Sequence, residues 1–253
     1  MLTKATVKLI QSLQTHKGRR KEGLFVAEGP RLVGELLGHF KCNLLLATEA
    51  WKGGDVQVDV PLIPVTSDEL QRASLLQTPQ QVLALFHIPR YATDFQESCS
   101  HRLCLALDDV QDPGNLGTIV RLADWFGIED IWCTTATADV WSPKAVQACM
   151  GGLARVRVHY INSLPQLLSS LPSDVPVYST SLQGSSLWQS SLSTHGVIVM
   201  GNEGRGVSAE VDACCRQRLL IPNYPEGRLT TESLNVAMAT GIVLAEFRRQ
   251  AAI

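Results

Sequence analysis

The spacing of apolar residues divides the first 90 residues into short helices and strands. Residues 3–14 carry apolar side chains at the spacing of an amphipathic helix, and a basic run at residues 16–23 follows. The pattern then predicts strands and helices in alternation, including a helix that Ser67 can cap. We therefore predict a small α/β unit in this part of the chain. Its strands are expected at residues 24–29, 42–48, 61–65 and 81–89, with a helix at 30–38.

Residues 91–101 lose this apolar pattern, and we interpret them as a linker between two domains. From residue 103 onward the strands become longer, and several are apolar without a polar alternate. Strands of this kind are typical of a parallel sheet that is covered on both faces. We expect them at residues 103–110, 130–135, 175–181, 196–201 and 218–222.

The composition is that of a globular protein, with 45% hydrophobic and 18% charged residues among 253. The net charge of −2 gives no overall attraction for nucleic acid, so any RNA-binding surface must be local. We expect no secretory signal and no membrane span, because the chain lacks an apolar core at its start and any run of about 18 apolar residues. Seven cysteines without a CxxC motif indicate reduced thiols in a cytoplasmic protein.

The first of three strand–loop–helix junctions spans residues 105–127. Its strand ends near Val110, and the turn sequence QDPGNLG leads into a helix that Asn115 can cap and Gly127 can end. Arg121 lies off the apolar stripe of this helix. Taken alone, it would be an ordinary surface arginine, and only the unusual loop beside it makes it a candidate site residue.

The second junction, residues 196–213, runs from an apolar strand into the sequence GNEGRG at residues 201–206. Its three glycines let the backbone approach a ligand closely and allow positive φ, and Glu203 lies in the bend. The spacing matches neither the dinucleotide-binding GxGxxG nor a phosphate-binding P-loop. Taken alone, the loop is also explained as a tight turn with a solvated glutamate.

The third junction is IPNYPEGRLTTESLNVAMATG, residues 221–241. Ser233, which alone would be an N-cap, and Asn235 precede a helix of small residues that must pack closely against a neighbour. All three loops follow strand ends, where ligands collect in an open parallel sheet. They hold a carboxylate, an arginine, a hydroxyl and two amides, but neither a set of metal ligands nor a nucleophilic triad.

The sequences DPGNLGTIVRLADWFG, VIVMGNEGRGVS and IPNYPEGRLTTESLNVAMATGI resemble, in order, the three motifs of the SpoU/TrmH family of RNA ribose 2′-O-methyltransferases, within the SPOUT class. The resemblance covers residues 103–250, and the three motifs together are highly specific. The sequences FVAEGPRLVGELL and TPQQVLALF resemble the ribosomal-protein-like substrate-binding domain that many members carry. The resemblance thus implies an RNA substrate-binding domain at residues 1–90, a linker at 91–101 and a methyltransferase domain at 102–253.

The resemblance implies an α/β fold with a parallel sheet whose C-terminal segment forms a trefoil knot, which no pattern in the sequence indicates. It further implies a homodimer that binds S-adenosylmethionine in the knot loops. By position in the motifs, the cofactor would be held by Gly201, Ile221 and Leu234. The catalytic and substrate-placing residues would be Asn115, Arg121, Glu203, Ser233 and Asn235.

Two features qualify this picture. An arginine stays protonated at neutral pH, so we expect Arg121 to clamp the phosphate beside the target ribose rather than to act as a base. The segment between Ile221 and Ser233 is about four residues longer than in the commonest members of the family, and we expect it to shape the cofactor pocket or to reach RNA.

The function that the resemblance implies is S-adenosylmethionine-dependent 2′-O-methylation of a ribose in structured RNA, and the N-terminal domain favours large-subunit rRNA. A tRNA methyltransferase and a catalytically silent RNA-binding scaffold stay open as alternatives. The absence of GxGxxG argues against a dehydrogenase. The basic residues Lys17, Arg19, Arg20 and Lys21, aided by Lys4 and Lys8, either contact the RNA backbone or form a solvated loop.

Overall fold

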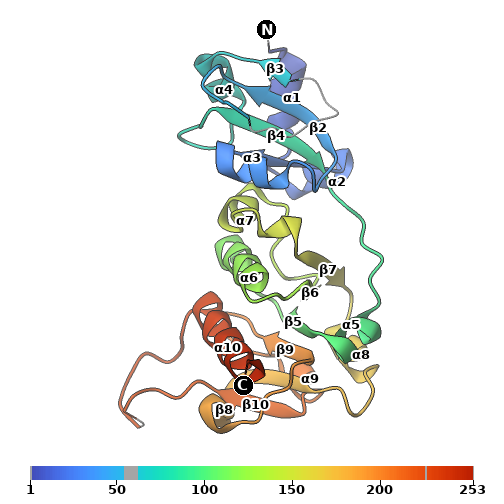
Figure 1. Cartoon of the computed structure of the whole chain (residues 1–253), viewed down its shortest axis with the longest axis vertical. Coiled ribbons are helices and arrows are strands. Elements are labelled where there is room, and N and C mark those ends of the chain that lie inside the picture. The colour runs from blue at the N-terminus through green and yellow to red at the C-terminus, as the bar shows by residue number, and fades with distance from the viewer. Residues whose placement is uncertain (1, 54–61, 226, 253) are drawn as a thin grey trace. The chain divides into compact units, whose positions relative to one another are not determined.

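The structure is a computed structural model that describes residues 2–53, 62–225 and 227–252. The chain forms two compact units, whose elements are labelled in Figure 1. Unit 1 comprises Met1–Arg90 and Asp139–Ala154, and unit 2 comprises Tyr91–Ala138 and Arg155–Ile253. The units therefore differ from the predicted domains at 139–154, a segment that the sequence pattern assigned to the second domain.

Unit 1 holds a four-stranded sheet in the order β1-β4-β2-β3, in which β4 is antiparallel to both neighbours and β2 is parallel to β3. The predicted strands are present, although residue 61 lies outside the described residues. Thr66, rather than Ser67, caps α4, because its hydroxyl accepts a hydrogen bond from the Glu69 N–H. The elements are α1 (Lys4–Ser12), α2 (His16–Glu22), β1 (Leu24–Glu28), α3 (Pro30–Leu36), β2 (Cys42–Ala47), β3 (Leu62–Pro64), α4 (Ser67–Ala73) and β4 (Val82–His87).

The segment 139–154 belongs to unit 1 because it completes an aromatic core there. Its helix α7 (Pro143–Ala148) packs against β1, and the Trp141 ring lies 4.8 Å from the Phe25 ring, centroid to centroid. A short 3-10 helix, η1 (Gly152–Ala154), packs against α3. The packing of Trp141 against Phe25 therefore places the segment in unit 1. The local sequence pattern could not indicate this, because it does not show which aromatic side chains are buried together.

The basic run is not a loop, because residues 16–22 form helix α2. Arg19 is buried in it, and its Nε and Nη2 donate to Oδ2 of Asp139 at 2.9 and 2.6 Å. Its remaining nitrogen, Nη1, donates to the carbonyls of Leu13 and Gln14. The guanidinium of Arg19 is therefore used inside unit 1, and only the other members of the predicted basic cluster are exposed to a ligand.

Unit 2 is built on a six-stranded sheet in the order β10-β8-β9-β5-β6-β7, and every pair in it is parallel. This confirms the predicted parallel sheet, to which the structure adds β7. Its strands are β5 (Leu103–Leu107), β6 (Asp130–Thr134), β7 (Arg157–Ile161), β8 (Val177–Ser186), β9 (Gly196–Met200) and β10 (Gln217–Leu220). Its helices are α5 (Phe95–His101), α6 (Pro113–Trp125), α8 (Leu164–Ser169), η2 (Leu187–Gln189), α9 (Ala209–Asp212) and α10 (Val236–Ala251).

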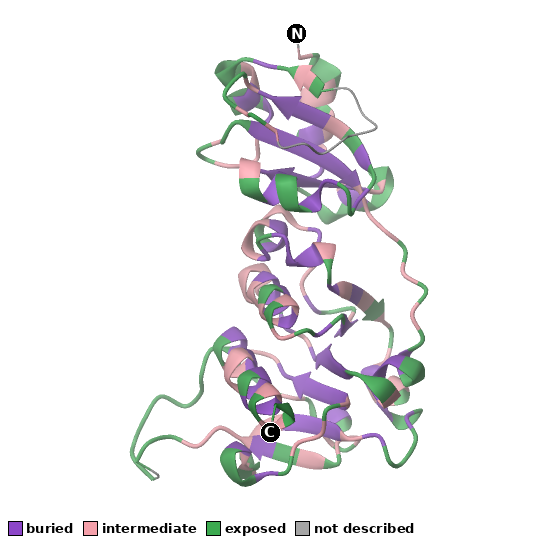
Figure 2. Cartoon of the chain, in the orientation of Figure 1, coloured by how far each residue is buried: buried purple, intermediate pink, exposed green. Residues whose placement is uncertain are grey.

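Much of the predicted linker is helical. Helix α5 occupies residues 95–101 and buries Phe95 and Cys99 in the core of unit 2, where the Phe95 ring meets Trp132 edge-on. All seven cysteines of the chain are free thiols. Figure 2 shows buried strands in both sheets and an exposed segment before α10. Within the described part of the chain, no helix combines the length and apolar character needed to cross a bilayer.

Candidate active site

Helices α6 and α10 lie side by side and run in the same direction. Asn115 and Asn235 meet at their first turns, and Arg248 donates to the Phe126 carbonyl at their last turns. Between these points, a Cβ atom placed on Gly241 would lie 3.4 Å from the Leu122 methyl groups. This confirms that the small residues of α10 allow close packing, and it brings two helix N-termini, far apart in the sequence, to one point.

Glu203 connects the loop after β9 with the loop after β5. Its carboxylate accepts hydrogen bonds from the backbone N–H groups of Gln111 and Asp112, both at 3.2 Å. It also accepts one from Nδ2 of Asn115 at 3.1 Å. Partial burial raises the pKa of Glu203, but the hydrogen bonds from Asn115 and from backbone N–H groups outweigh it, so the pKa lies below its usual value. Glu203 is therefore a carboxylate at neutral pH.

Asn235 joins the third loop to this pair. Its Oδ1 accepts from the N–H groups of Ala237 and Met238, which makes Asn235 the N-cap of α10 in place of Ser233. Its Nδ2 donates to Oδ1 of Asn115 at 3.0 Å. Oδ1 of Asn115 and Oδ1 of Asn235 both accept hydrogen bonds, and this fixes the orientation of each side-chain amide. The structure thus links Glu203, Asn115 and Asn235 into one chain of hydrogen bonds.

Asn115 is not the cap of α6, although it lies in the first turn. Oδ1 of Asp112 accepts from the Asn115 N–H at 2.9 Å, so Asp112 is the N-cap. The backbone N–H of Asn115 is thereby satisfied, and its side-chain amide remains available for Glu203 and Asn235. Gly127, at φ 66°, ends the helix as predicted.

The GNEGRG loop is a closed turn. Asn202 and Gly206 exchange two backbone hydrogen bonds of 2.9 Å, and Oδ1 of Asn202 accepts from the N–H groups of Gly204 and Arg205. Gly201 must be glycine, because a Cβ there would clash with the backbone of Gly206 and Val207. The turn fixes the backbone position of Glu203, and this allows its carboxylate to accept from all three donors, the N–H groups of Gln111 and Asp112 and the side-chain amide of Asn115.

A pocket of about 430 Å³ lies beside this turn, against the middle of β8 and the carboxyl ends of β9 and β10. The three residues predicted to hold the cofactor all line it, together with Glu203 and Ser233. Ser233 is exposed, and its hydroxyl makes no hydrogen bond with any described residue. The predicted cofactor residues are Gly201, Ile221 and Leu234. The rest of the lining combines apolar side chains, among them Met200, Leu219, Leu220, Val236 and Ala239, with polar and charged ones, among them Thr180, Asn202, Arg205, Asp212 and Glu232.

Arg121 is the predicted site residue that the structure does not join to the others. It is exposed on α6, and it contacts no described residue through a hydrogen bond or ion pair. Six residues separate it from Asn115, which corresponds to about 9 Å along a helix and to another side of it. Within one chain, the predicted convergence therefore includes Glu203 and Asn235 but not Arg121.

Sequence reasoning missed three residues that shape this site. Asp109 adopts φ 62°, a left-handed conformation that aspartate tolerates, and its carboxylate accepts a 2.7 Å hydrogen bond from Thr134. Nδ2 of Asn202 donates to the Asp109 carbonyl at 2.8 Å. Arg205 reaches Oδ2 of Asp109 at 3.4 Å. Their only signal in the sequence is their place in the loops, because the contacts cross more than 90 residues.

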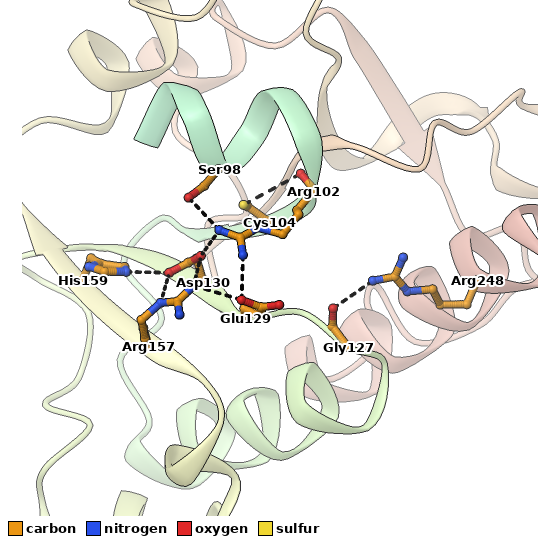
Figure 3. A network of polar contacts seen from close by, with 9 residues as sticks. All are labelled: Ser98, Arg102, Cys104, Gly127, Glu129, Asp130, Arg157, His159 and Arg248. Carbon is orange, nitrogen blue, oxygen red and sulfur yellow. Dashed lines mark hydrogen bonds and ion pairs between the residues drawn. The ribbon is translucent and has the colours of Figure 1, made fainter. Parts of the chain in front are cut away.

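A second polar cluster surrounds Asp130 (Figure 3), which is the first residue of β6 and so lies at the amino end of a strand. The buried carboxylate of Asp130 receives two 2.7 Å hydrogen bonds from Arg157 and contacts Nε2 of His159 at 2.9 Å. Burial raises the pKa of Asp130, but Arg157 and His159 hold it well below its usual range. Because Asp130 is fully paired where strands begin rather than end, this cluster stabilises the sheet and lies apart from the pocket.

The chain matches known proteins over most of its length. Residues 102–245 match the SpoU rRNA Methylase family, and residues 4–84 match the MRM3-like substrate binding domain. The chain is 32% identical to the 23S rRNA (guanosine(2553)-2′-O)-methyltransferase RlmP of Bacillus subtilis, over 96% of this chain and 95% of that protein.

Solved structures agree with these matches. A putative RNA methyltransferase of the TrmH family from Porphyromonas gingivalis superposes with a TM-score of 0.87 at 41% identity, over 99% of both chains. The S-adenosylmethionine-bound rRNA methyltransferase of Sinorhizobium meliloti superposes with a TM-score of 0.82 at 30% identity, over 98% of this chain and 96% of that one. The chain therefore belongs to the SpoU rRNA methylase family, as its three loop motifs predicted.

Proposed function

We propose that this enzyme transfers a methyl group from S-adenosylmethionine to the 2′-oxygen of a ribose in large-subunit rRNA. The observation that carries the proposal is the hydrogen-bonded chain of Glu203, Asn115 and Asn235 beside the pocket. It joins the three loops that hold the family motifs. RlmP of Bacillus subtilis, which the chain resembles over 96% of its length, acts on 23S rRNA.

The pocket fits S-adenosylmethionine. Its volume of about 430 Å³ lies within the usual range for small-molecule sites, about 300–1,000 Å³. The apolar residues of its lining suit an adenine ring, and the backbone at Gly201 offers polar groups without a side chain in the way. Gly201, Ile221 and Leu234 would hold the cofactor. When bound, S-adenosylmethionine supplies a methyl group on a positively charged sulfur.

The polar residues beside the pocket position the ribose. A 2′-hydroxyl is a weak nucleophile, so the enzyme must align its oxygen with the methyl group, and alignment alone can supply up to about 7–11 kcal/mol in favourable models. Ser233, which lines the pocket, and Asn235, which is exposed two residues on, can hold the sugar hydroxyls. Glu203 keeps Asn115 in place. A carboxylate with a lowered pKa is a poor base at neutral pH, which makes Glu203 a positioning residue.

Arg121 is proposed to clamp the phosphate beside the target ribose. It is exposed and has no described partner, so its guanidinium is available to an RNA oxygen. A guanidinium binds phosphate through two parallel hydrogen bonds, which a lysine cannot form. Arg121→Lys should therefore lose most methyl transfer while it keeps cofactor binding. Near-full activity in this variant would remove Arg121 from the clamp role.

The finer family features are also part of the proposal. We expect a substrate-binding domain at residues 1–90, a linker at 91–101 and a knotted methyltransferase domain at 102–253. The family matches at residues 4–84 and 102–245 support the two domains, whereas the structure packs residues 139–154 with unit 1 and helix α5 with unit 2. Two exposed apolar side chains support a homodimer: Trp125 on α6 is 83% exposed and Met238 on α10 is 63% exposed. Free thiols support a cytoplasmic location. Light scattering on Trp125→Glu, which should give a monomer, tests the dimer.

Deletion of the gene, followed by mapping of 2′-O-methyl marks across rRNA and tRNA, tests the function. We expect the loss of a mark in large-subunit rRNA, restored by the wild-type copy and not by Arg121→Ala. A lost mark in tRNA would instead support the tRNA methyltransferase. A complete set of marks, with a purified protein that binds RNA, would support the silent scaffold.

A further inference from the structure

Among the described residues, the lining of the pocket includes one side chain with a positive charge. Among the described residues that line it, Arg205 is the only lysine or arginine, whereas Glu203, Asp212 and Glu232 contribute carboxylates. Arg121, the arginine that the family motifs single out, does not line the pocket. An anionic substrate that enters from this side therefore meets Arg205 as the one cation among the described lining residues, because Arg218 lies outside the lining and is paired with Asp212.

The backbone of Arg205 is held in a fixed place relative to Glu203. Its N–H donates to Oδ1 of Asn202 at 3.1 Å, inside the turn that the Asn202–Gly206 hydrogen bonds close. Only one residue lies between Arg205 and Glu203, so their Cα atoms are at most about 7 Å apart. The guanidinium of Arg205 therefore works within reach of the Glu203–Asn115–Asn235 chain.

The side chain of Arg205, by contrast, is held weakly. Among the described residues its partner is Asp109, through one contact of 3.4 Å between Nη2 and Oδ2, and the Arg205 side chain is 72% exposed. A long, exposed ion pair of this kind contributes little to stability. Most of the hydrogen-bond donors of the guanidinium are unused in the described structure, so it can turn to a ligand at little cost.

The geometry points to Arg205 as the residue that holds the phosphodiester 3′ to the target ribose, which leaves the 5′ phosphodiester to the Arg121 clamp; this inference rests on the proposed function. In RNA, the 2′-oxygen and the 3′-phosphate are borne by neighbouring carbons of one sugar, so a site that takes the 2′-oxygen also receives that phosphate. Two lining carboxylates, Glu203 and Glu232, have no ion pair with a described residue, whereas Asp212 is paired with Arg218, so a phosphate would be repelled there without a cation. Asp109 holds Arg205 near the pocket until the phosphate replaces it.

Filter binding of an in vitro transcribed 23S rRNA across a salt series tests this contact without depending on catalysis. Loss of one phosphate contact should weaken binding of Arg205→Ala about 10-fold at low salt and reduce the slope of log K against log salt by about 0.7–0.9. Arg205→Lys keeps the charge and should restore the slope. The dissociation constant of S-adenosylmethionine, measured by calorimetry, should change less than about 2-fold, because Gly201, Ile221 and Leu234, rather than Arg205, are proposed to hold the cofactor.

Arg155→Ala is the matched control. Arg155 is also a partly exposed arginine in an ion pair, with Asp124 at 2.7 Å, near the last turn of α6 and far along that helix from Asn115. Its loss should leave the salt slope unchanged.

Three outcomes would overturn the inference. One is an Arg205→Ala protein with the wild-type affinity and salt slope. Another is a salt slope that falls equally in Arg155→Ala. The third is weaker S-adenosylmethionine binding with unchanged RNA binding, which would make the cofactor carboxylate the partner of Arg205. A wild-type protein that binds the transcript and methylates no RNA would refute the proposed function, while the salt slope would still decide the Arg205 contact.

Discussion

Replacing Glu203 by glutamine tests the hydrogen-bonded chain at the site. The side chain keeps its shape, but one acceptor oxygen becomes an NH₂ group that cannot accept a hydrogen bond. If NH₂ replaces Oε1, the bonds from Asp112 and Asn115 are both lost. If it replaces Oε2, only the bond from Gln111 is lost. The variant should choose the second orientation, which keeps Asn115 bonded but removes the negative charge.

The magnitude follows from these contacts. A hydrogen bond to a charged group contributes about 1.5–3 kcal/mol, and the partial exposure of Glu203 places it at the low end. Loss of one bond and weakening of two others should lower the free energy of unfolding by about 1–2 kcal/mol. For a protein of this size, that corresponds to a fall in Tm of about 2–8 °C. The looser hold on Asn115 and Asn235 should reduce kcat by about 10- to 100-fold.

Differential scanning fluorimetry gives the Tm, and transfer of a tritiated methyl group to in vitro transcribed 23S rRNA gives kcat. Glu97→Gln serves as the control, because the Glu97 side chain is exposed and its described contact, with His101, is 3.9 Å long. A Glu203→Gln enzyme with unchanged Tm and unchanged kcat would refute the reasoning. So would a Glu97→Gln enzyme that is equally impaired.

Three further predictions concern stability. Gly241→Ala should raise the free energy of unfolding by about 0.5–1 kcal/mol in urea melts, because alanine favours a helix and its methyl group would meet Leu122 at 3.4 Å, an ordinary contact; a fall would contradict this. Arg19→Ala should cost about 3–5 kcal/mol, because it removes the charge partner of Asp139 and the donor to two backbone carbonyls, while the exposed neighbour Arg20→Ala should be nearly neutral. Asp130→Asn should cost about 3–5 kcal/mol at pH 7. The pKa of Asp130 is lower in the folded state than in the unfolded state, so its contribution to the free energy of unfolding is present above about pH 4 and is lost as the pH falls. In urea melts, the difference in this free energy between variant and wild type should therefore shrink below about pH 4. A difference that stays constant would count against this.

The resemblance of three motifs led directly to the family, which the match at residues 102–245 confirms. The strands were predictable because a buried strand needs a continuous apolar run, which is a local property. Helix caps were predicted one to three residues away from their true positions. Asp112 and Asn115 are both able to cap the helix, and the sequence does not show which of them does. Asp112 accepts the capping hydrogen bond, whereas the Asn115 side chain donates to Glu203, which is distant in the sequence.

The sequence by itself determined the parallel sheet, the three loops at strand ends and the residue types that they present, because apolar runs, glycines and turn residues act over a few positions. The tertiary structure alone decided how these parts meet. It joined Asn115 to Glu203 across 88 residues and to Asn235 across 120, paired Arg19 with Asp139, and placed Arg205 rather than Arg121 at the pocket. Such contacts depend on which surfaces are buried together, and no spacing along the chain encodes a partner a hundred residues away.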